Sequence, residues 1–278
     1  MQTDHLILAV RDLDAAHADF EKLGFTLTDR KAFTHDAAGL GNHLIYLAGI
    51  YIELMGNVRA DQQTALSPIL AQRQGLAGIA VTAGNVEAAV QHAQSLGFLS
   101  QVSEFEVHFQ ADGTDYNGRF RATRLMQPEL KSSWVQIVEE LVPYDRTPFY
   151  RPHKNTASKV TKTVFVDQGD GPAVLTQLLG QSTNTVPASW ADTKQTFALL
   201  SAHQFEERYG SLPDINGVNE AIPGAIHIAV ESLDEAAGVL DVNAVPFTRG
   251  NGACVVTAEH CCGSILVFEQ GGHGGAHR

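Results

Sequence analysis

The sequence has little positive charge, and this scarcity excludes several classes of partner. Nineteen lysines and arginines stand against 31 aspartates and glutamates, giving a formal net charge of −12 over 278 residues. Nucleic acids and anionic membranes are bound by clustered positive charge, and no basic run interleaved with aromatic residues occurs. We therefore expect neither nucleic acid nor a membrane surface as a partner.

The chain also lacks an apolar run of the ~20 residues that a membrane span needs and an N-terminal signal pattern, which predicts a cytoplasmic protein. Its three cysteines, Cys254, Cys261 and Cys262, are odd in number and lack C-x-x-C spacing. They predict buried apolar side chains rather than disulfides or a zinc site. Charged residues make up 18% of the chain, below the roughly 25% that is usual, which is compatible with a homodimer.

What the sequence does contain is a repeat. Residues 12–25 (DLDAAHADFEKLGF) and 85–98 (NVEAAVQHAQSLGF) share their length, an Ala-Ala pair and a Leu-Gly-Phe end, and each follows a short apolar run. A looser copy covers 226–247. Each apolar run predicts a strand, and the segment after it predicts a helix, which in the first copy is capped by Asp12 and ends at Gly24. With the further apolar runs that follow, the pattern predicts a β-α-β-β-β module.

The repeat and the spacing of apolar runs predict four modules with a break between the second and the third. Three prolines and no regular period predict a linker at 143–157. The predicted units are a first pair at 1–142 (modules 1–56 and 75–142), a second pair at 158–270 (modules 158–210 and 224–269) and a disordered tail at 271–278.

Two side chains of the first module are candidates for chemistry. His5 opens the first apolar run and shares a face with Ile7, while Glu53 shares a face with Tyr51. On adjoining strands of one curved sheet, the two could converge on its concave side. Imidazole and carboxylate are ligands for Zn, Ni, Mn or Fe. A histidine in a strand is also compatible with a hydrogen-bonded core residue, and both interpretations stay open on the pattern alone.

The text DHLILAVRDLDAA…LGF followed by GIYIELMG resembles the first module of the vicinal oxygen chelate superfamily. That superfamily includes glyoxalase I, extradiol dioxygenases, methylmalonyl-CoA epimerase and the bleomycin- and fosfomycin-resistance proteins. His5 ahead of Asp12-Leu13, Glu53-Leu54 late in the last strand, and a loop from His35 to Asn42 carry the resemblance. It implies an α+β fold in which four βαβββ modules pair into two open, incomplete β-barrels. It also implies that each paired module supplies a metal ligand from its first strand and one from its last.

Modules two and three depart from this pattern. Alignment on the helices places Gly78 and Gln136 of module two where His5 and Glu53 stand in module one. Module three offers Thr161 at the first of these positions. None of the three is a good metal ligand, which argues against an extradiol dioxygenase.

Module four keeps both residue types. Helix alignment gives Ala225 and Val267, but His227 and Glu269 stand two residues further on, and a shift of two preserves the face. Some four-module members of the superfamily pair module one with module four, which here would unite His5, Glu53, His227 and Glu269 around one divalent metal ion. The alternative is that His227 is a core residue and Glu269 begins a frayed tail.

Two functions follow from the resemblance. The first is a metal-dependent lyase or isomerase of glyoxalase type, in which the ion stabilises an enediolate of a small oxygenated or carbonyl substrate and Glu53 or Glu269 is the catalytic base. The second is a metal-free protein that sequesters a small molecule in an apolar pocket. The pocket residues expected in that case are Tyr46, Tyr51, Trp134 and Phe165. Side chains whose role stays open are His35, His43, His108, Arg119, Arg121 and Arg124, of which the arginines could bind an acidic substrate or form a solvated face.

Overall fold

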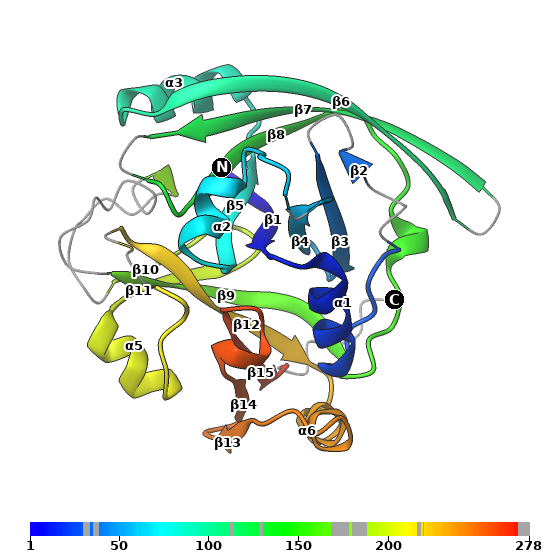
Figure 1. Cartoon of the computed structure of the whole chain (residues 1–278), viewed down its shortest axis with the longest axis vertical. Helices are drawn as coiled ribbons and strands as arrows, with labels where there is room; N and C mark the ends of the chain where they lie inside the picture. Colours follow the sequence, from blue (N-terminus) through cyan, green and yellow to red (C-terminus); the bar gives the residue numbers. More distant parts are fainter. Residues whose placement is uncertain are drawn as a thin grey trace.

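The computed structural model describes residues 1–29, 34–35, 39–59, 61–111, 114–127, 130–167, 178–179, 188–215, 218 and 220–271. Two mixed β-sheets form its framework, with short helices beside them (Figure 1). No helix within these ranges is long and apolar enough to cross a membrane.

The first sheet has eight strands in the order β2-β3-β4-β1-β5-β8-β7-β6. Its strands are β1 (Gln2–Ala9), β2 (Thr34–His35), β3 (Leu40–Tyr46), β4 (Tyr51–Asn57), β5 (Gly75–Thr82), β6 (Leu99–Ala111), β7 (Thr114–Met126) and β8 (Trp134–Val142). The accompanying helices are α1 (Leu13–Lys22), α2 (Ser67–Gln72) and α3 (Val86–Ser95). Because β1 pairs antiparallel with β5, modules one and two share this curved sheet.

The second sheet has seven strands in the order β10-β11-β9-β12-β15-β14-β13. Its strands are β9 (Ala157–Asp167), β10 (Ala188–Ala191), β11 (Thr196–Ser201), β12 (Ile222–Val230), β13 (Thr248–Gly250), β14 (Ala253–Val256) and β15 (Ile265–Gln270). It carries α5 (Ala202–Tyr209) and α6 (Leu233–Val242). Here β12 pairs antiparallel with β9, so modules three and four share a sheet as well.

The three repeated helices begin in the same way. Asp12, Asn85 and Ser232 are extended N-cap residues whose side chains accept hydrogen bonds from backbone N–H groups of the first turn. Such caps satisfy amides that have no partner within the helix. This shared signal is why the repeat could be recognised in the sequence.

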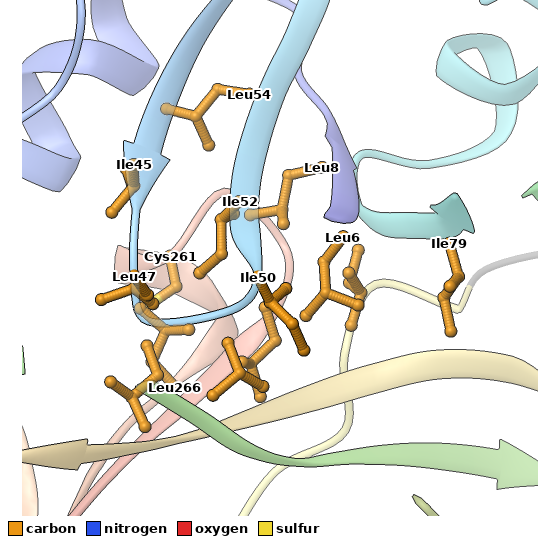
Figure 2. Close-up of a cluster of buried hydrophobic side chains, with 14 of the residues drawn as sticks. Leu6, Leu8, Ile45, Leu47, Ile50, Ile52, Leu54, Ile79, Cys261 and Leu266 are labelled. Atoms are coloured by element: carbon orange, nitrogen blue, oxygen red, sulfur yellow. The ribbon is translucent and has the colours of Figure 1, made fainter. Parts of the chain in front are cut away.

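The two sheets pack back to back through one large apolar cluster. Leu6 and Leu8 of β1 belong to the same buried cluster as Ile226 and Ile228 of β12. Figure 2 shows leucines and isoleucines of the first sheet gathered with Cys261 and Leu266 in this layer. Since side chains alternate along a strand, the odd-numbered residues at 5, 7 and 225, 227 face the opposite, concave sides.

Strand β6 is a long free edge. All thirteen of its residues pair with β7, and the two strands arch together over the top of the molecule (Figure 1). Phe105 and Val107 pack inward, while Glu104, Glu106 and His108 are exposed. The Arg121 guanidinium of β7 forms ion pairs with the carboxylates of Glu104, at 2.9 Å, and of Glu139 in β8, at 2.8 Å.

Two helices, α2 and α5, were not expected from the repeat. Helix α2 lies between modules one and two, and α5 follows β11 directly. Ser201 and Gln204 form a complete capping box at the start of α5, which ends the strand and begins a helix. Residues 25–29 (FTLTD), a run that predicts a strand from its alternation, have no regular structure. Residues 172–179 (PAVLTQLL), where Pro172 favours the first turn of a helix, lie outside the described residues except for Leu178 and Leu179.

Candidate functional site

A cavity of about 260 Å³ opens in the concave face of the first sheet, directly over His5 and Glu53. His5 is only 2% exposed and lies beside β4, in register with Tyr51. The rest of the lining is largely apolar or aromatic. Its members include Leu44, Tyr51, Phe105, Val107, Phe120, Val138 and Tyr144.

His5 is held by acidic and aromatic neighbours. Its Nδ1 lies 2.8 Å from Asp4 Oδ2 and its Nε2 lies 3.3 Å from Glu53 Oε2. The ring also stacks on Tyr51, with centroids 4.4 Å apart. Burial opposes the imidazolium, but the hydrogen bonds and charges of Asp4 and Glu53 outweigh burial and raise the pKa of His5 to about 9. In the same pair, burial works against the ionised Asp4 carboxyl, but its contacts with His5 keep its pKa below the ordinary value.

Asp4 was not foreseen as a site residue, because neighbouring residues on a regular strand point to opposite faces. The pairing of β1 with β5 shifts register between Thr3 and His5. Such a bulge re-aims side chains, and here it lets the carboxylate at position 4 reach the imidazole at position 5. The sequence shows only that an aspartate precedes the histidine.

Glu53 and Gln136 are positioned by hydrogen bonds from their own neighbours. Asn42 Nδ2 donates to Glu53 Oε1 at 2.6 Å. Trp134 Nε1 donates to Gln136 Oε1 at 3.0 Å, so the Gln136 amide nitrogen faces His5 Nε2 at 3.3 Å. Asn42 lies in β3, at the end of the segment from His35 that carried the sequence resemblance, but its bond to Glu53 could not be predicted from the sequence.

The two groups near His5 Nε2, the Glu53 carboxylate and the Gln136 amide, cannot both be satisfied by one protonation state of the ring. When Nε2 carries a proton it can donate to the Glu53 carboxylate, but the N–H then also faces the amide nitrogen of Gln136, which is itself a donor. Without that proton Gln136 can donate, but the Glu53 carboxylate then faces a lone pair. A divalent cation resolves the conflict between the imidazole and the carboxylate, and two ligand atoms 3.3 Å apart can share an ion that bonds each at ~2.0–2.2 Å.

The surroundings also fit such an ion. A metal-binding histidine usually donates its other ring N–H to a carboxylate, and a binding carboxylate is itself hydrogen-bonded, as Asp4 and Asn42 provide here. Within the described ranges, no three or more His, Cys, Asp or Glu side chains are grouped to hold a metal. An ion would therefore depend on His5 and Glu53, with the Gln136 amide oxygen available only if it gives up its bond from Trp134.

Gly78 explains why module two supplies no first-strand ligand. The pairs His5–Tyr51 and Ile7–Glu53 of module one correspond to Gly78–Trp134 and Ala80–Gln136 of module two. The equivalences expected from the helices are therefore confirmed. A Cβ atom at Gly78 would overlap the carbonyl oxygen of Trp134 and lie 2.5 Å from its carbonyl carbon. No side chain fits at this position.

The second sheet holds a matching pair. His227 is in register with Val267, and Ala229 is in register with Glu269. In module one, His5 is in register with Tyr51 and Ile7 with Glu53 in the same way. The shift of two residues inferred for module four is thus present in the strands. His227 Nδ1 lies 3.0 Å from Glu269 Oε2.

In this second pair the imidazole is covered, whereas the Glu269 side chain is 32% exposed. Tyr209, at the end of α5, places its hydroxyl 2.9 Å from His227 Nε2, and Thr161 Oγ1 donates to Glu269 Oε1 at 2.5 Å. Burial is the main cause that lowers the pKa of His227, whereas the hydrogen bond from His227 is the main cause that lowers the pKa of Glu269 to about 2. A neutral imidazole that donates to an ionised Glu269 and accepts from Tyr209 satisfies all these contacts.

The expectation that one site unites His5, Glu53, His227 and Glu269 is corrected by this arrangement. The two pairs belong to different sheets, and each faces the concave side of its own sheet. The apolar layer of Leu6 and Ile226 lies between those faces. Each histidine does meet the carboxylate of its own module, but Glu269 has no access to the cavity over His5.

A prediction concerns the contribution of Glu269 to the stability of the fold at acid pH. The pKa of this carboxyl falls from an ordinary 4.5 to about 2 in the folded protein, so its stabilising contribution is present above pH 4.5 and is lost as the pH falls toward 2. Glu269→Gln should lower the free energy of unfolding by about 1 kcal/mol at neutral pH. Urea titrations of both proteins should show this difference shrinking steadily below pH 4.5. A difference that stays constant down to pH 3 would contradict the assignment.

The remaining predicted residues divide between the cavity, the core and the surface. Tyr51 lines the cavity, whereas Tyr46 and Trp134 pack beside it and Phe165 lies in the layer between the sheets. His43 hydrogen-bonds the Thr28 carbonyl, outside the cavity. His108 is exposed at the cavity rim and contacts Glu106 and Asn117. His35 lies in β2, and its side chain is outside the described part. Arg121 forms ion pairs on the sheet surface, Arg119 is exposed, and Arg124 lies over the Trp134 ring.

Paired βαβββ modules in open, curved sheets, with a histidine and a carboxylate on the concave side, define a protein of the vicinal oxygen chelate class. A family model described as a glyoxalase-like domain matches residues 3–180, more than half of the chain. The chain belongs to this glyoxalase-like family.

Solved structures show the same fold. A hypothetical protein from Staphylococcus aureus is 14% identical with a TM-score of 0.60, over 97% of this chain and 99% of that one. A mutant of 4-hydroxymandelate synthase from Streptomyces coelicolor is 11% identical with a TM-score of 0.62, over 99% and 94%. At these identities the likeness concerns the fold alone. No curated protein matches the sequence.

Proposed function

We propose that the chain is a divalent-metal-dependent lyase or isomerase of glyoxalase type that acts on a small oxygenated or carbonyl substrate. The observation that carries this proposal is the convergence of His5 Nε2 and Glu53 Oε2, 3.3 Å apart, at the base of the cavity. Each group is oriented by a partner of its own, Asp4 for the imidazole and Asn42 for the carboxylate. His5 and Glu53 would hold the ion, and the small number of protein ligands leaves coordination positions for substrate oxygens.

The residues around the cavity have distinct roles in such a reaction. The ion, when bound, supplies stabilisation of negative charge on a substrate oxygen as a neighbouring carbon loses its proton. Glu53 would accept that proton at Oε2 when this oxygen leaves the ion, while the hydrogen bond from Asn42 keeps Oε1 in place. Stacking on Tyr51 fixes the plane of the His5 ring. Phe105, Phe120 and Val138 line the walls with apolar surface and limit the access of water to the reacting carbon.

A metal-free binding protein of the same fold is the second candidate. It is favoured by Gly78, where no ligand side chain fits, and by the aromatic and aliphatic lining, which suits capture of a small apolar molecule. The two candidates differ in metal content. Protein purified without chelators should contain one divalent ion per chain if the enzyme proposal is correct. Clearly substoichiometric metal, with no uptake from added Mn²⁺, Ni²⁺ or Zn²⁺, would favour the binding protein.

A second prediction tests the role of Glu53. The metal-loaded protein should exchange the α-hydrogen of a simple hydroxy-carbonyl compound such as hydroxyacetone with deuterium from solvent, which NMR can follow. Glu53→Gln should slow this exchange by about 10²–10⁴-fold, the range typical of a lost general base. Glu269→Gln, the same substitution in the covered pair, should exchange at the wild-type rate. Equal loss in both variants would contradict the assignment of Glu53 as the base.

A further inference from the structure

A second cavity of about 280 Å³ lies beside α2, where it meets the end of β7 and the start of β8. It shares no described lining residue with the cavity over His5. Its polar walls come from Gln72, Arg124, Gln127, Lys131 and Ser133.

The charge of this cavity is opposite to that of the protein as a whole. Arg124 and Lys131 line it, and none of its described lining residues is acidic, although the chain carries a net charge of −12. The Arg124 guanidinium lies 4.0 Å from the centre of the Trp134 ring and donates to the Ala65 carbonyl at 3.1 Å. Burial lowers the pKa of Arg124.

Several polar atoms at the cavity have no partner within the described part of the chain. Ser133 is 8% exposed, and its hydroxyl makes no hydrogen bond. Neither do Arg124 Nε and Gln127 Oε1. The neighbouring Ser132 makes two hydrogen bonds. Its backbone N–H donates to Glu220 Oε1 at 2.6 Å, and its hydroxyl donates to Gln72 Oε1 at 2.5 Å. Because an unpaired buried polar group costs about 1–3 kcal/mol, native proteins rarely leave a cluster of them without a bound water, ion or other ligand.

We propose that this cavity binds a small molecule through an oxyanion, a carboxylate or a phosphate group. The Arg124 guanidinium and the Lys131 ammonium supply the positive charge, and the Ser133 hydroxyl donates a hydrogen bond. Guanidinium groups bind carboxylates and phosphates through charge-assisted hydrogen bonds. Gln127 Oε1 accepts from a hydroxyl group elsewhere on the same ligand.

The chain offers its own reporter for this site. Its two tryptophans are Trp134 and Trp190, so Trp190→Phe leaves Trp134, in contact with Arg124, as the single source of tryptophan emission. Inorganic phosphate and acetate are titrated separately into this variant at constant ionic strength, with chloride as the replaced ion. At least one of the two should give a saturable change in Trp134 emission together with a rise in melting temperature, and the stronger response identifies the preferred group.

Matched variants assign the binding to the cavity. In the Trp190→Phe background, Arg124→Gln and Ser133→Ala should each weaken the response, the arginine variant by about tenfold or more. Arg119→Gln removes the same charge from an exposed position of the same strand and should leave the affinity unchanged. Glu53→Gln should bind equally well, which separates this site from the proposed reaction. No saturable response to either anion, or equal losses in Arg119→Gln and Arg124→Gln, would overturn the proposal. If Arg124→Gln does not fold, Ser133→Ala alone decides.

Discussion

Replacing His5 by alanine is expected to lower the affinity of the protein for a divalent metal ion by about a hundredfold or more, because loss of even an outer-shell partner typically costs about 10–100-fold. His5 supplies an imidazole at the cavity base, where Asp4 orients it and Glu53 faces it. Competition of Mn²⁺ against a chelating dye measures the affinity. Asp4→Asn should give an intermediate loss, since it removes only the group that holds the ring.

The control for this prediction lies in the other sheet. His227→Ala removes the same side chain from the same register position, but at a pair that Tyr209 and the back-to-back packing separate from the cavity. Its Mn²⁺ affinity should equal that of the wild type. Undiminished Mn²⁺ binding by His5→Ala, or equal losses in the two variants, would contradict the assignment of the site to the first sheet. Melting temperatures of both variants show whether a loss reflects unfolding.

Replacing Gly78 by alanine is expected to lower the free energy of unfolding by about 3 kcal/mol or more. The added Cβ would overlap the Trp134 carbonyl oxygen on the paired strand, and backbone cannot move aside as a flexible side chain can. Displacement of β8 would also move Gln136 away from His5. Urea denaturation measures the change.

Gly84→Ala is the matched control, since a Cβ there meets nothing within 4 Å. Its stability should stay within about 0.5 kcal/mol of the wild type, as is usual for surface substitutions. Equal stability of the two variants would show that β5 and β8 tolerate a side chain between them. Glycine would then not be required at position 78 for the pairing of these two strands.

The sequence was sufficient to predict the modules and the equivalent positions within them. The N-caps at Asp12 and Asn85 and the glycines that end the helices are local signals, and each depends on a few neighbouring residues. Alternation along strands is also local. For this reason the equivalence of Gln136 with Glu53, and the meeting of His227 with Glu269, could be inferred before the strands were seen.

The sequence did not determine which pairs would share a site. The partner of a site depends on which module pairs its first strand with β1. That strand is β5 of module two, and its place in the sheet depends on backbone contacts such as the one that requires glycine at position 78. Tyr209 could not be predicted to cover His227, because the reach of a side chain from α5 depends on how the helix docks on the sheet. The bulge that brings Asp4 to His5 leaves no mark in the sequence other than their adjacency.

The free edge of β6 has a consequence for self-association. A long edge strand exposes backbone groups that can pair with a second chain. Two copies that met along β6 would bring Glu104 and Glu106 of one chain against the same acidic row of the other, and like charges across a strand pair are destabilising. Arg121 of β7 neutralises part of this row from within its own chain, so its guanidinium is already engaged. The edge is therefore open to an incoming strand that carries lysine or arginine, but it discourages polymerisation of the protein with itself.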